Sequence, residues 1–241
     1  MSTATRVAAP GQASGLALAG VGRAYLAFKR LLDVLVAACA LLALAPAFAA
    51  IALAIKLDSP GPMIYRQRRV RGNQSPDEPH PEAQVFDFLK FRSMYVNADQ
   101  SLHRRYVSEY IRGNGANNGS AAKPLYKMKK DPRITRVGRL LRRTSLDELP
   151  QFINVLRGDM SLVGPRPALP YEVEQYDRHH RQRLVPQAGL TGLWQVSGRT
   201  TLSFEQMVQL DIAYGQRRSL ALDLEILLKT VPAVLSRDGA W

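Results

Sequence analysis

Residues 34–55, with the sequence VLVAACALLALAPAFAAIALAI, form a run of 22 residues without a charged side chain. A helix of this length can cross the ~30 Å hydrocarbon core of a bilayer. Pro46 lies near the middle of the run, and a proline inside a helix removes a backbone hydrogen bond and kinks the helix. The run therefore predicts a membrane element. It is either one spanning helix or a re-entrant helix that bends at Ala45-Pro46 and leaves by the face through which it entered.

Cationic residues flank this run on both sides, whereas a spanning helix usually carries its excess of Lys and Arg on one side. The symmetric flanks favour the re-entrant arrangement, although the residues alone leave both arrangements open. The flanking cations are Arg23, Lys29 and Arg30 before the run and Lys56, Arg66, Arg68, Arg69 and Arg71 after it.

The charge balance of the chain restricts its partners. The 241 residues include 33 Lys and Arg against 20 Asp and Glu, a net charge of +13. Such an excess indicates a polyanionic partner, which is nucleic acid, an anionic membrane surface or a phosphorylated substrate. The sequence has no recognised nucleic-acid-binding motif and only 7% aromatic residues, so no nucleic-acid partner is predicted. A membrane-tethered basic nucleic-acid-binding module and a non-catalytic membrane scaffold stay as the alternative functions. Cys39 is the single cysteine, which excludes an internal disulfide and a Cys-based metal site.

The chain is expected to have three parts: a disordered tail of residues 1–28, the membrane helix of residues 29–57 and a folded domain of residues 58–241. The domain is predicted to be α+β and helix-rich. Residues 63–67 and 85–91 read as short strands, residues 97–111 as a helix and residues 113–122 as a loop. A stripe of apolar residues at helical spacing near the C-terminus favours core packing, with a membrane-surface helix as the alternative. The stripe consists of Leu220, Leu224, Leu227, Leu228, Val231 and Leu235.

The charge pattern changes abruptly near residue 145. Residues 127–143 contain eight Lys and Arg and one acid, and SLDELP follows, with Asp147 and Glu148 side by side. Chemistry on phosphates needs this combination, because cations neutralise phosphate oxygens while a carboxylate attacks phosphorus or holds a divalent metal. The alternative is structural. Ser145-x-x-Glu148 is a capping-box pattern for a helix that buries Leu149, Phe152, Ile153 and Leu156, that ends at Gly158, and that could instead restart at Pro150.

Two later segments each present an arginine on a stretch that contains glycine or proline. They are GDMSLVGPRP, residues 158–167, which contains Arg166, and GLTGLWQVSGR, residues 189–199, which ends in Arg199. A guanidinium held on such a stretch can make a bidentate phosphate contact with little further loss of conformational entropy. Exposed arginines on structural turns are the alternative interpretation.

Together these motifs resemble the bacterial sugar transferases known as monotopic phosphoglycosyl transferases, the polyprenyl-phosphate hexose-1-phosphate transferases that begin exopolysaccharide and O-antigen (lipopolysaccharide) assembly. The resemblance extends from about Lys29 to the C-terminus. It rests on an ordered series of motifs: SLDELPQ at residues 145–151, NVLRGDMS at 154–161, GPRP at 164–167 and GLTGLWQVSGR at 189–199.

The resemblance implies a function and a location. The substrates would be a UDP-sugar and a polyprenyl (undecaprenyl) phosphate, with UMP as product and Mg²⁺ as cofactor. The membrane element would be a re-entrant helix broken at Pro46. It would hold a cytoplasmic catalytic domain with membrane-surface helices at the inner (cytoplasmic) membrane of a bacterium. A homo-oligomer is compatible with the sequence, and the identity of the hexose is left open.

The resemblance also implies roles for individual residues. Asp147 would be the nucleophile that forms a covalent phosphosugar intermediate, and Glu148 would serve the magnesium site together with it. Four cationic residues would bind substrate phosphates: Lys90, Arg142, Arg166 and Arg199. One departure from the family pattern is visible, because Gln187-Ala188-Gly189 stands where many relatives have Arg or Lys followed by Pro-Gly. A basic residue near the nucleotide is therefore not expected at that loop.

Overall fold

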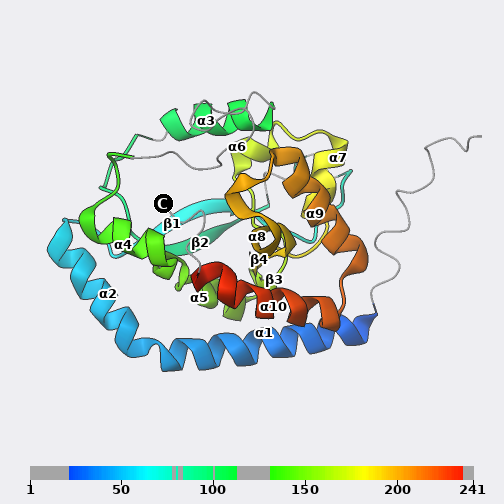
Figure 1. The fold of residues 1–241 in the computed structure, drawn as a ribbon, viewed down its shortest axis with the longest axis horizontal. Coiled ribbons are helices and arrows are strands. Elements are labelled where there is room, and N and C mark those ends of the chain that lie inside the picture. The colour runs from blue at the N-terminus through cyan, green and yellow to red at the C-terminus, as the bar shows by residue number, and fades with distance from the viewer. Residues whose placement is uncertain (1–21, 78–79, 81–83, 100, 113–130, 236–241) are drawn as a thin grey trace, which may run out of the picture.

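The computed structural model describes residues 22–77, 80, 84–99, 101–112 and 131–235 (Figure 1). The prediction of a disordered tail over residues 1–28 is wrong for residues 23–28, which are helical. Tail residues 1–21 and the predicted loop of residues 113–122 lie outside the described part. Two long helices, α1 (Arg23–Ala43) and α2 (Ala45–Asp58), run along one side of a domain of short helices and strands. The helix-rich α+β class predicted for that domain is confirmed.

The predicted apolar helix is broken where the sequence indicated. Leu44 ends α1 and precedes α2, Pro46 lies in the first turn of α2, and the two helix axes are bent by 61°. Proline is tolerated there because the first-turn N–H groups have no partner within the helix. Within the described residues no single helix has the length and apolarity to cross a membrane, whereas the bent pair does when counted together. The helical arm is longer than residues 29–57 at both ends, since α1 begins at Arg23.

Polar side chains attach α1 to the domain. Lys29 is buried, and its Nζ donates to the Asp223 carboxylate at 2.8 Å and to the Val163 main-chain oxygen at 3.0 Å. Asp33 is also buried and accepts a hydrogen bond from the Leu162 N–H at 2.9 Å. Because buried charges are costly unless they are paired, these contacts set how α1 lies against the domain.

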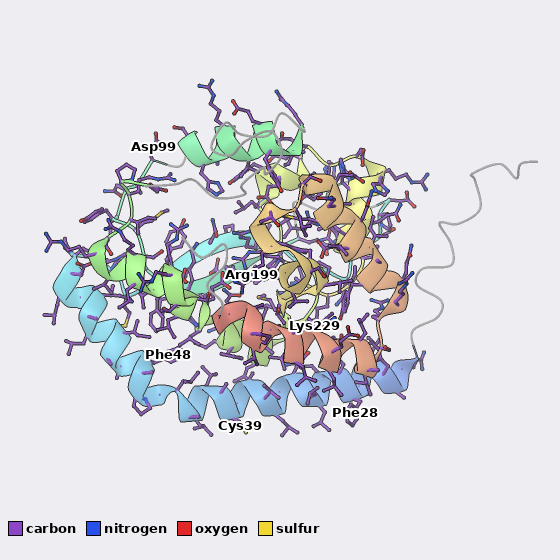
Figure 2. The ribbon with its side chains drawn as sticks, viewed as in Figure 1. Phe28, Cys39, Phe48, Asp99, Arg199 and Lys229 are labelled. Carbon is purple, nitrogen blue, oxygen red and sulfur yellow. The ribbon has the colours of Figure 1, made fainter. Side chains whose placement is uncertain are left out.

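The opposite side of α1 is apolar and open. In Figure 2, Phe28 and Cys39 lie on the side of α1 that faces away from the domain, and both are exposed. The large apolar side chains exposed on α1 and α2 are Leu26, Phe28, Leu31, Leu35, Val36, Leu42, Leu53 and Leu57.

Two strands form the first sheet of the domain. Strand β1 (Ile64–Val70) pairs antiparallel with β2 (Val85–Phe91), with Tyr65 opposite Lys90. The prediction for residues 85–91 is confirmed, but β1 extends three residues beyond the predicted 63–67 and begins one residue later. The strand continues through Arg68 and Arg69 because its end is joined to the rest of the domain, with the Val70 N–H donating to Ala168.

A second sheet brings the two predicted glycine-containing segments together. Strand β3 (Ser161–Val163) pairs in parallel with β4 (Gly189–Thr191). The chains after them cross so closely that a Cβ added at Gly189 would lie 2.1 Å from the Gly164 nitrogen. Glycine is therefore needed at this crossing for space.

The remaining elements surround these sheets. Their bounds are α3 (Ser101–Ile111), α4 (Arg136–Thr144), η2 (Leu146–Glu148), α5 (Gln151–Arg157), α6 (Pro170–Val173), α7 (Arg178–Arg181), η3 (Gln182–Leu184), α8 (Leu193–Ser197), η4 (Arg199–Thr201), α9 (Phe204–Arg217) and α10 (Leu220–Leu235). Helix α3 begins four residues later than predicted.

The prediction that the C-terminal stripe packs in the core is confirmed for Leu227, which is half-buried against the core, and wrong for most of the stripe. In α10 the buried side chains are Asp223 and Ile226, whereas Leu224, Leu228 and Val231 are 50%, 73% and 59% exposed. Asp223 faces inward because it accepts hydrogen bonds from Lys29, Tyr25 and Tyr214. This pairing turns Leu224 and Leu228 outward, which is the orientation that the alternative, a membrane-surface helix, requires.

Candidate active site

The Asp147–Glu148 pair lies in a tight turn between two helices. Helix α4 begins at Thr135, whose side chain accepts from the Gly138 N–H, and it ends at Ser145. Ser145 has a left-handed backbone with φ of 57°, which is uncommon for a residue other than glycine. The chain then forms the short 3₁₀ helix η2, in which Asp147 is buried and Glu148 is half-buried. The left-handed residue therefore directs the two carboxylates away from the axis of α4.

The capping-box alternative is wrong. The Ser145 side chain makes no capping hydrogen bond, and helix α5 starts at Gln151 after Pro150. The predicted restart at Pro150 and the end at Gly158, with φ of 82°, are confirmed. The predicted buried face is shifted, because the fully buried side chains of α5 are Gln151, Asn154 and Val155. The shift follows from the position of α5 between α1 and β2, which both contact it.

Glu148 is paired with Arg166. The Arg166 guanidinium donates to both Glu148 carboxylate oxygens, at 2.7 and 3.4 Å. The Arg166 guanidinium lies 5.7 Å from the centre of the Phe88 ring, and the Arg69 guanidinium lies 5.2 Å from the same ring. Arg69 also donates to the Pro167 main-chain oxygen at 2.8 Å. Arg69 and Phe88 therefore hold the segment that carries Arg166 next to the carboxylates.

Lys90 belongs to the same cluster. Burial, together with the nearby charges of Arg69, Arg142 and Arg166, lowers the pKa of the Lys90 ammonium to about 7, while the Asp147 carboxylate acts in the opposite direction. The Lys90 Nζ lies 5.3 Å from the centre of the Tyr65 ring, its neighbour across the sheet. A lysine crowded by other cations in this way gains its charge most readily when an anion binds beside it.

Only some of the predicted arginine cluster points inward. Arg136, Arg139 and Arg143 are exposed on α4, and Lys127, Lys129 and Lys130 lie outside the described residues. Arg142 is half-buried, and its Nη1 atom is buried without a hydrogen-bond partner among the described residues. A buried guanidinium N–H without an acceptor is costly. Arg142 therefore offers a donor for an anion beside the carboxylates.

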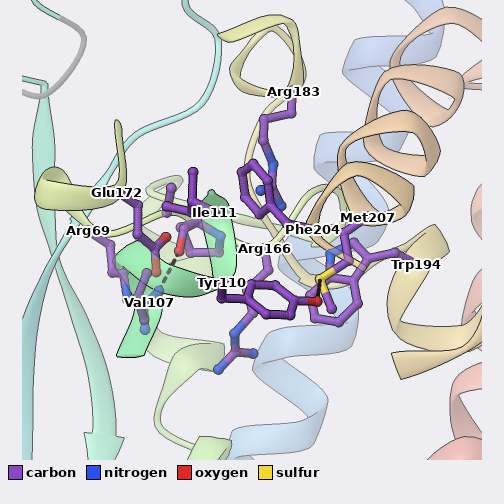
Figure 3. A pocket seen from close by; sticks show the side chains of 12 residues that line it. Arg69, Val107, Tyr110, Ile111, Arg166, Glu172, Arg183, Trp194, Phe204 and Met207 are labelled. Atoms are coloured by element: carbon purple, nitrogen blue, oxygen red, sulfur yellow. Dashed lines mark hydrogen bonds between the residues drawn. The ribbon is translucent and has the colours of Figure 1, made fainter. Parts of the chain in front are cut away.

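A small pocket is lined in part by Arg166 (Figure 3). Its wall contains Arg69, Arg183 and Glu172 and the aromatic rings of Tyr110, Trp194 and Phe204. Arg183 is held by the buried Asp211 carboxylate at 2.6 Å, so its charge is already balanced. Arg166 therefore lines this pocket and also pairs with Glu148.

Arg199 and Gln187 are placed differently. Arg199 begins η4 with φ of 52°, and its Nε donates to the Gln195 main-chain oxygen at 3.3 Å. The Gln187 side chain donates to the Gly158 main-chain oxygen at 3.0 Å. Gln187, which departs from the family pattern, is therefore bound to the residue that ends α5.

The carboxylates suit magnesium only in part. In the described part of the chain, no group of three or more His, Cys, Asp or Glu side chains could hold a metal ion. Mg²⁺ is commonly bound by one or two carboxylates together with substrate phosphates and water, rather than by a complete protein cage. Asp147 and Glu148 fit that mode of binding, in which the substrate completes the site.

Three residues of this site were not singled out as site residues by their sequence: Arg69, Phe88 and Asn154. Arg69 was seen only as a flanking cation and Phe88 only as part of a strand. Asn154 was noted only within a family motif. A buried arginine at the end of a strand gives no local signal, because the carbonyl that it binds is 98 residues away.

The chain is similar to a family of known proteins. The pattern that defines the bacterial sugar transferase family matches residues 24–237. The exopolysaccharide production protein ExoY of Sinorhizobium fredii is 41% identical over 213 residues, which are 88% of each chain. The UDP-glucose:undecaprenyl-phosphate glucose-1-phosphate transferase of Caulobacter vibrioides is 40% identical over 88% of this chain and 72% of its own length.

A third relative is longer than this chain. The undecaprenyl-phosphate galactose phosphotransferase of Salmonella typhimurium is 42% identical over 75% of this chain, but the matched part is 35% of its own length. The chain belongs to the bacterial sugar transferase family and is an enzyme of that class. The predicted resemblance is thereby confirmed.

Proposed function

We propose that this enzyme transfers a hexose-1-phosphate from a UDP-sugar to undecaprenyl phosphate and releases UMP, as a first membrane step of exopolysaccharide or O-antigen synthesis. The names of the similar proteins support the substrate classes. The observation that carries the proposal is that Lys90, Arg142 and Arg166 surround Asp147 and Glu148, with one Arg142 nitrogen lacking an acceptor among the described residues.

In the first step, an Asp147 carboxylate oxygen attacks the phosphorus that carries the sugar. The bond from that phosphorus to the bridging oxygen breaks, and UMP leaves with the electron pair. A carboxylate and a diphosphate repel each other, so the step needs cations on the phosphate oxygens. Lys90, Arg142 and Arg166 supply positive charge on the side of the carboxylates from which phosphate must approach.

Glu148 would hold Mg²⁺ together with Asp147 and the diphosphate. When bound, the ion would supply further positive charge to the leaving UMP. In the free enzyme Arg166 forms a salt bridge with Glu148, so this salt bridge must break when Glu148 binds the ion. Arg166 is then available to a phosphate oxygen in the bidentate geometry that a guanidinium allows.

In the second step, an oxygen of the lipid phosphate attacks the same phosphorus and the Asp147 carboxylate leaves. The product is a sugar linked to the lipid by a diphosphate. Dividing the transfer into two steps lets one set of cations serve both attacks. Because the acceptor is embedded in lipid, the site must lie at a membrane surface.

The apolar surfaces support a membrane location. The outer side of α1 and α2 and the outer side of α10 both expose leucines. The bend of 61° between α1 and α2 suits a re-entrant helix that enters and leaves by the cytoplasmic face of the inner membrane. The exposed arginines of α4 would face the anionic headgroups.

The test is release of UMP from a UDP-sugar in the absence of lipid acceptor. Asp147→Asn should abolish this release and overall transfer, and Glu148→Gln should slow both. Peptide analysis of the wild type after incubation with UDP-sugar alone should find a hexose-phosphate on Asp147. Asp177→Asn is the matched control, because Asp177 is an exposed acid that caps the short helix α7 and pairs with His180.

Different failures have different meanings. An adduct on another residue, or UMP release only when lipid is present, would refute the covalent mechanism and leave the transferase in place. Absence of UMP release with every UDP-sugar, with or without undecaprenyl phosphate, would refute the proposed substrates.

A further inference from the structure

Asn154 connects the carboxylate segment to the strand that carries Lys90. Its side chain is fully buried, seven residues after Asp147 and one turn into α5. The Asn154 Oδ1 atom accepts from the Leu89 N–H at 2.9 Å, and the Nδ2 atom donates to the Asp87 main-chain oxygen at 2.7 Å. The side chain therefore holds the two residues immediately around Phe88, directly before Lys90.

The edge of β2 explains why an amide is needed there. Among the described residues β2 pairs only with β1, and alternate residues of an antiparallel strand turn their main-chain groups to the other edge. The N–H of Arg92, directly after β2, donates to the oxygen of Met63, directly before β1. By alternation, Asp87 and Leu89 turn their main-chain groups away from β1. The Asn154 carboxamide presents one N–H donor and its oxygen acceptor to this edge, as a peptide group does, and it completes the edge as a third strand would.

Asp159 fixes the orientation of the amide. The Asn154 Nδ2 also donates to an Asp159 carboxylate oxygen at 3.2 Å, while the other Asp159 oxygen is bound by Arg71 at 2.5 Å. The Asn154 main-chain oxygen accepts from the Asp159 N–H, so the loop after α5 closes on the same residue. With these contacts the amide can be placed in only one of its two flipped orientations.

The segment between Asn154 and the carboxylates is short and hydrogen-bonded throughout. The N–H of Leu149 donates to Leu146, that of Phe152 to Leu149 and that of Ile153 to Pro150. A shift of α5 along β2 would therefore move η2 with it. The same shift would change the separation of the carboxylates from Lys90, since Lys90 stays with β2.

We propose that Asn154 is a positioning residue, which sets the distance between the Asp147–Glu148 carboxylates and Lys90 by holding α5 to the edge of β2. This inference rests on the proposed function of the dyad. It assigns to a buried amide outside the reacting groups a role in the chemical step rather than only in folding. Misplacement by about 1 Å can slow a reaction by about a hundredfold.

The matched comparison is Asn154→Ala against Val155→Ala in the full-length enzyme. Val155 is the next residue of α5 and is also fully buried, but its side chain makes only apolar contacts in the core. Both variants remove buried atoms from the same helix, and only Asn154→Ala releases the strand edge. Asn154→Leu is a second variant, because leucine fills a similar volume without a charge and still releases the Leu89 N–H and the Asp87 main-chain oxygen.

Three quantities are measured for each variant: the folded fraction by thermal unfolding, the UDP-sugar Kd by calorimetry, and the rates of UMP release and of transfer to undecaprenyl phosphate at saturating UDP-sugar. We expect Asn154→Ala to slow both rates at least about tenfold more than Val155→Ala per folded molecule. The Kd should change much less than the rates, since the arginines stay in place. Asn154→Leu should slow both rates about as much as Asn154→Ala, and it decides the question if the alanine variant does not fold.

Equal rates per folded molecule in the Asn154 variants and in Val155→Ala would overturn the proposal. That result would leave Asn154 as a residue of the fold alone. Failure of the proposed function is distinguishable, because the wild type itself would then neither release UMP nor transfer sugar phosphate.

Discussion

Binding of a UDP-sugar should take up a proton at Lys90. In the enzyme without substrate, burial and neighbouring cations lower the pKa of Lys90 to about 7. At pH 8 Lys90 is therefore protonated in about one molecule in ten. A bound diphosphate adds negative charge beside Lys90 and raises this pKa again. We therefore expect uptake of about 0.9 protons for each UDP-sugar bound at pH 8, and clearly less at pH 6.

The affinity should follow the same linkage. As pH rises above 7, an increasing share of Lys90 must gain its proton on binding, and the affinity should fall by up to about tenfold for each pH unit. The effect of the Lys90 charge on folding stability is opposite in sign to that of a lysine paired with an acid. Because the folded-state pKa lies below the usual 10.5, the cost of the Lys90 charge is greatest below pH 7 and disappears as pH rises.

Calorimetry in buffers of different ionisation enthalpy counts the protons taken up. Asp147→Asn is the background for this measurement, because it prevents turnover. Removal of that carboxylate also lowers the Lys90 pKa further, which brings the uptake at pH 8 closer to one proton. Lys90→Met should abolish the uptake at pH 8, and Lys229→Met, at an exposed lysine of α10, should not.

The reasoning would be refuted if the proton uptake at pH 8 were the same with Lys90→Met, or if no proton were taken up in the Asp147→Asn background. Either result would mean that Lys90 does not gain charge next to the diphosphate. The UDP-sugar itself has no group that titrates in this range, so the measured protons belong to the protein.

Three further predictions concern the metal, the topology and the core. In the free enzyme Glu148 is paired with Arg166, so Mn²⁺ and UDP-sugar should each bind at least about fivefold more tightly in the presence of the other. Electron paramagnetic resonance measures this coupling, and Arg166→Met should reduce it. In a chain whose cysteine is replaced by alanine, Gly22→Cys and Ser75→Cys should both be labelled only from the cytoplasmic side; labelling from opposite sides would contradict the re-entrant helix. Gln151 is fully buried, and neither amide atom has a hydrogen-bond partner among the described residues. Gln151→Met should therefore stabilise the fold by about 1–3 kcal/mol, seen as a higher Tm. An unchanged or lower Tm would mean that the amide binds substrate or a buried water.

Local sequence determined the features that depend on a few neighbouring residues. A proline inside an apolar helix predicted the break between α1 and α2, because the missing N–H acts on the preceding turn. Pro150 and Gly158 predicted where α5 begins and ends for equally local reasons. The family resemblance, carried by contiguous motifs, identified the class of enzyme that the comparisons confirm.

Tertiary structure decided which polar groups face inward. Ser145 and Glu148 have the spacing of a capping box, but the left-handed turn at Ser145 and the pairing with Arg166 place Glu148 in the site instead. The leucines of α10 point outward because Asp223 pairs with Lys29, which is 194 residues away. A helical period shows that apolar residues share one side of a helix, but it does not show whether that side faces the core. Burial of a charged residue depends on partners from distant parts of the chain. For the same reason, the connection of Asn154 to the strand of Lys90 became visible only in the folded molecule.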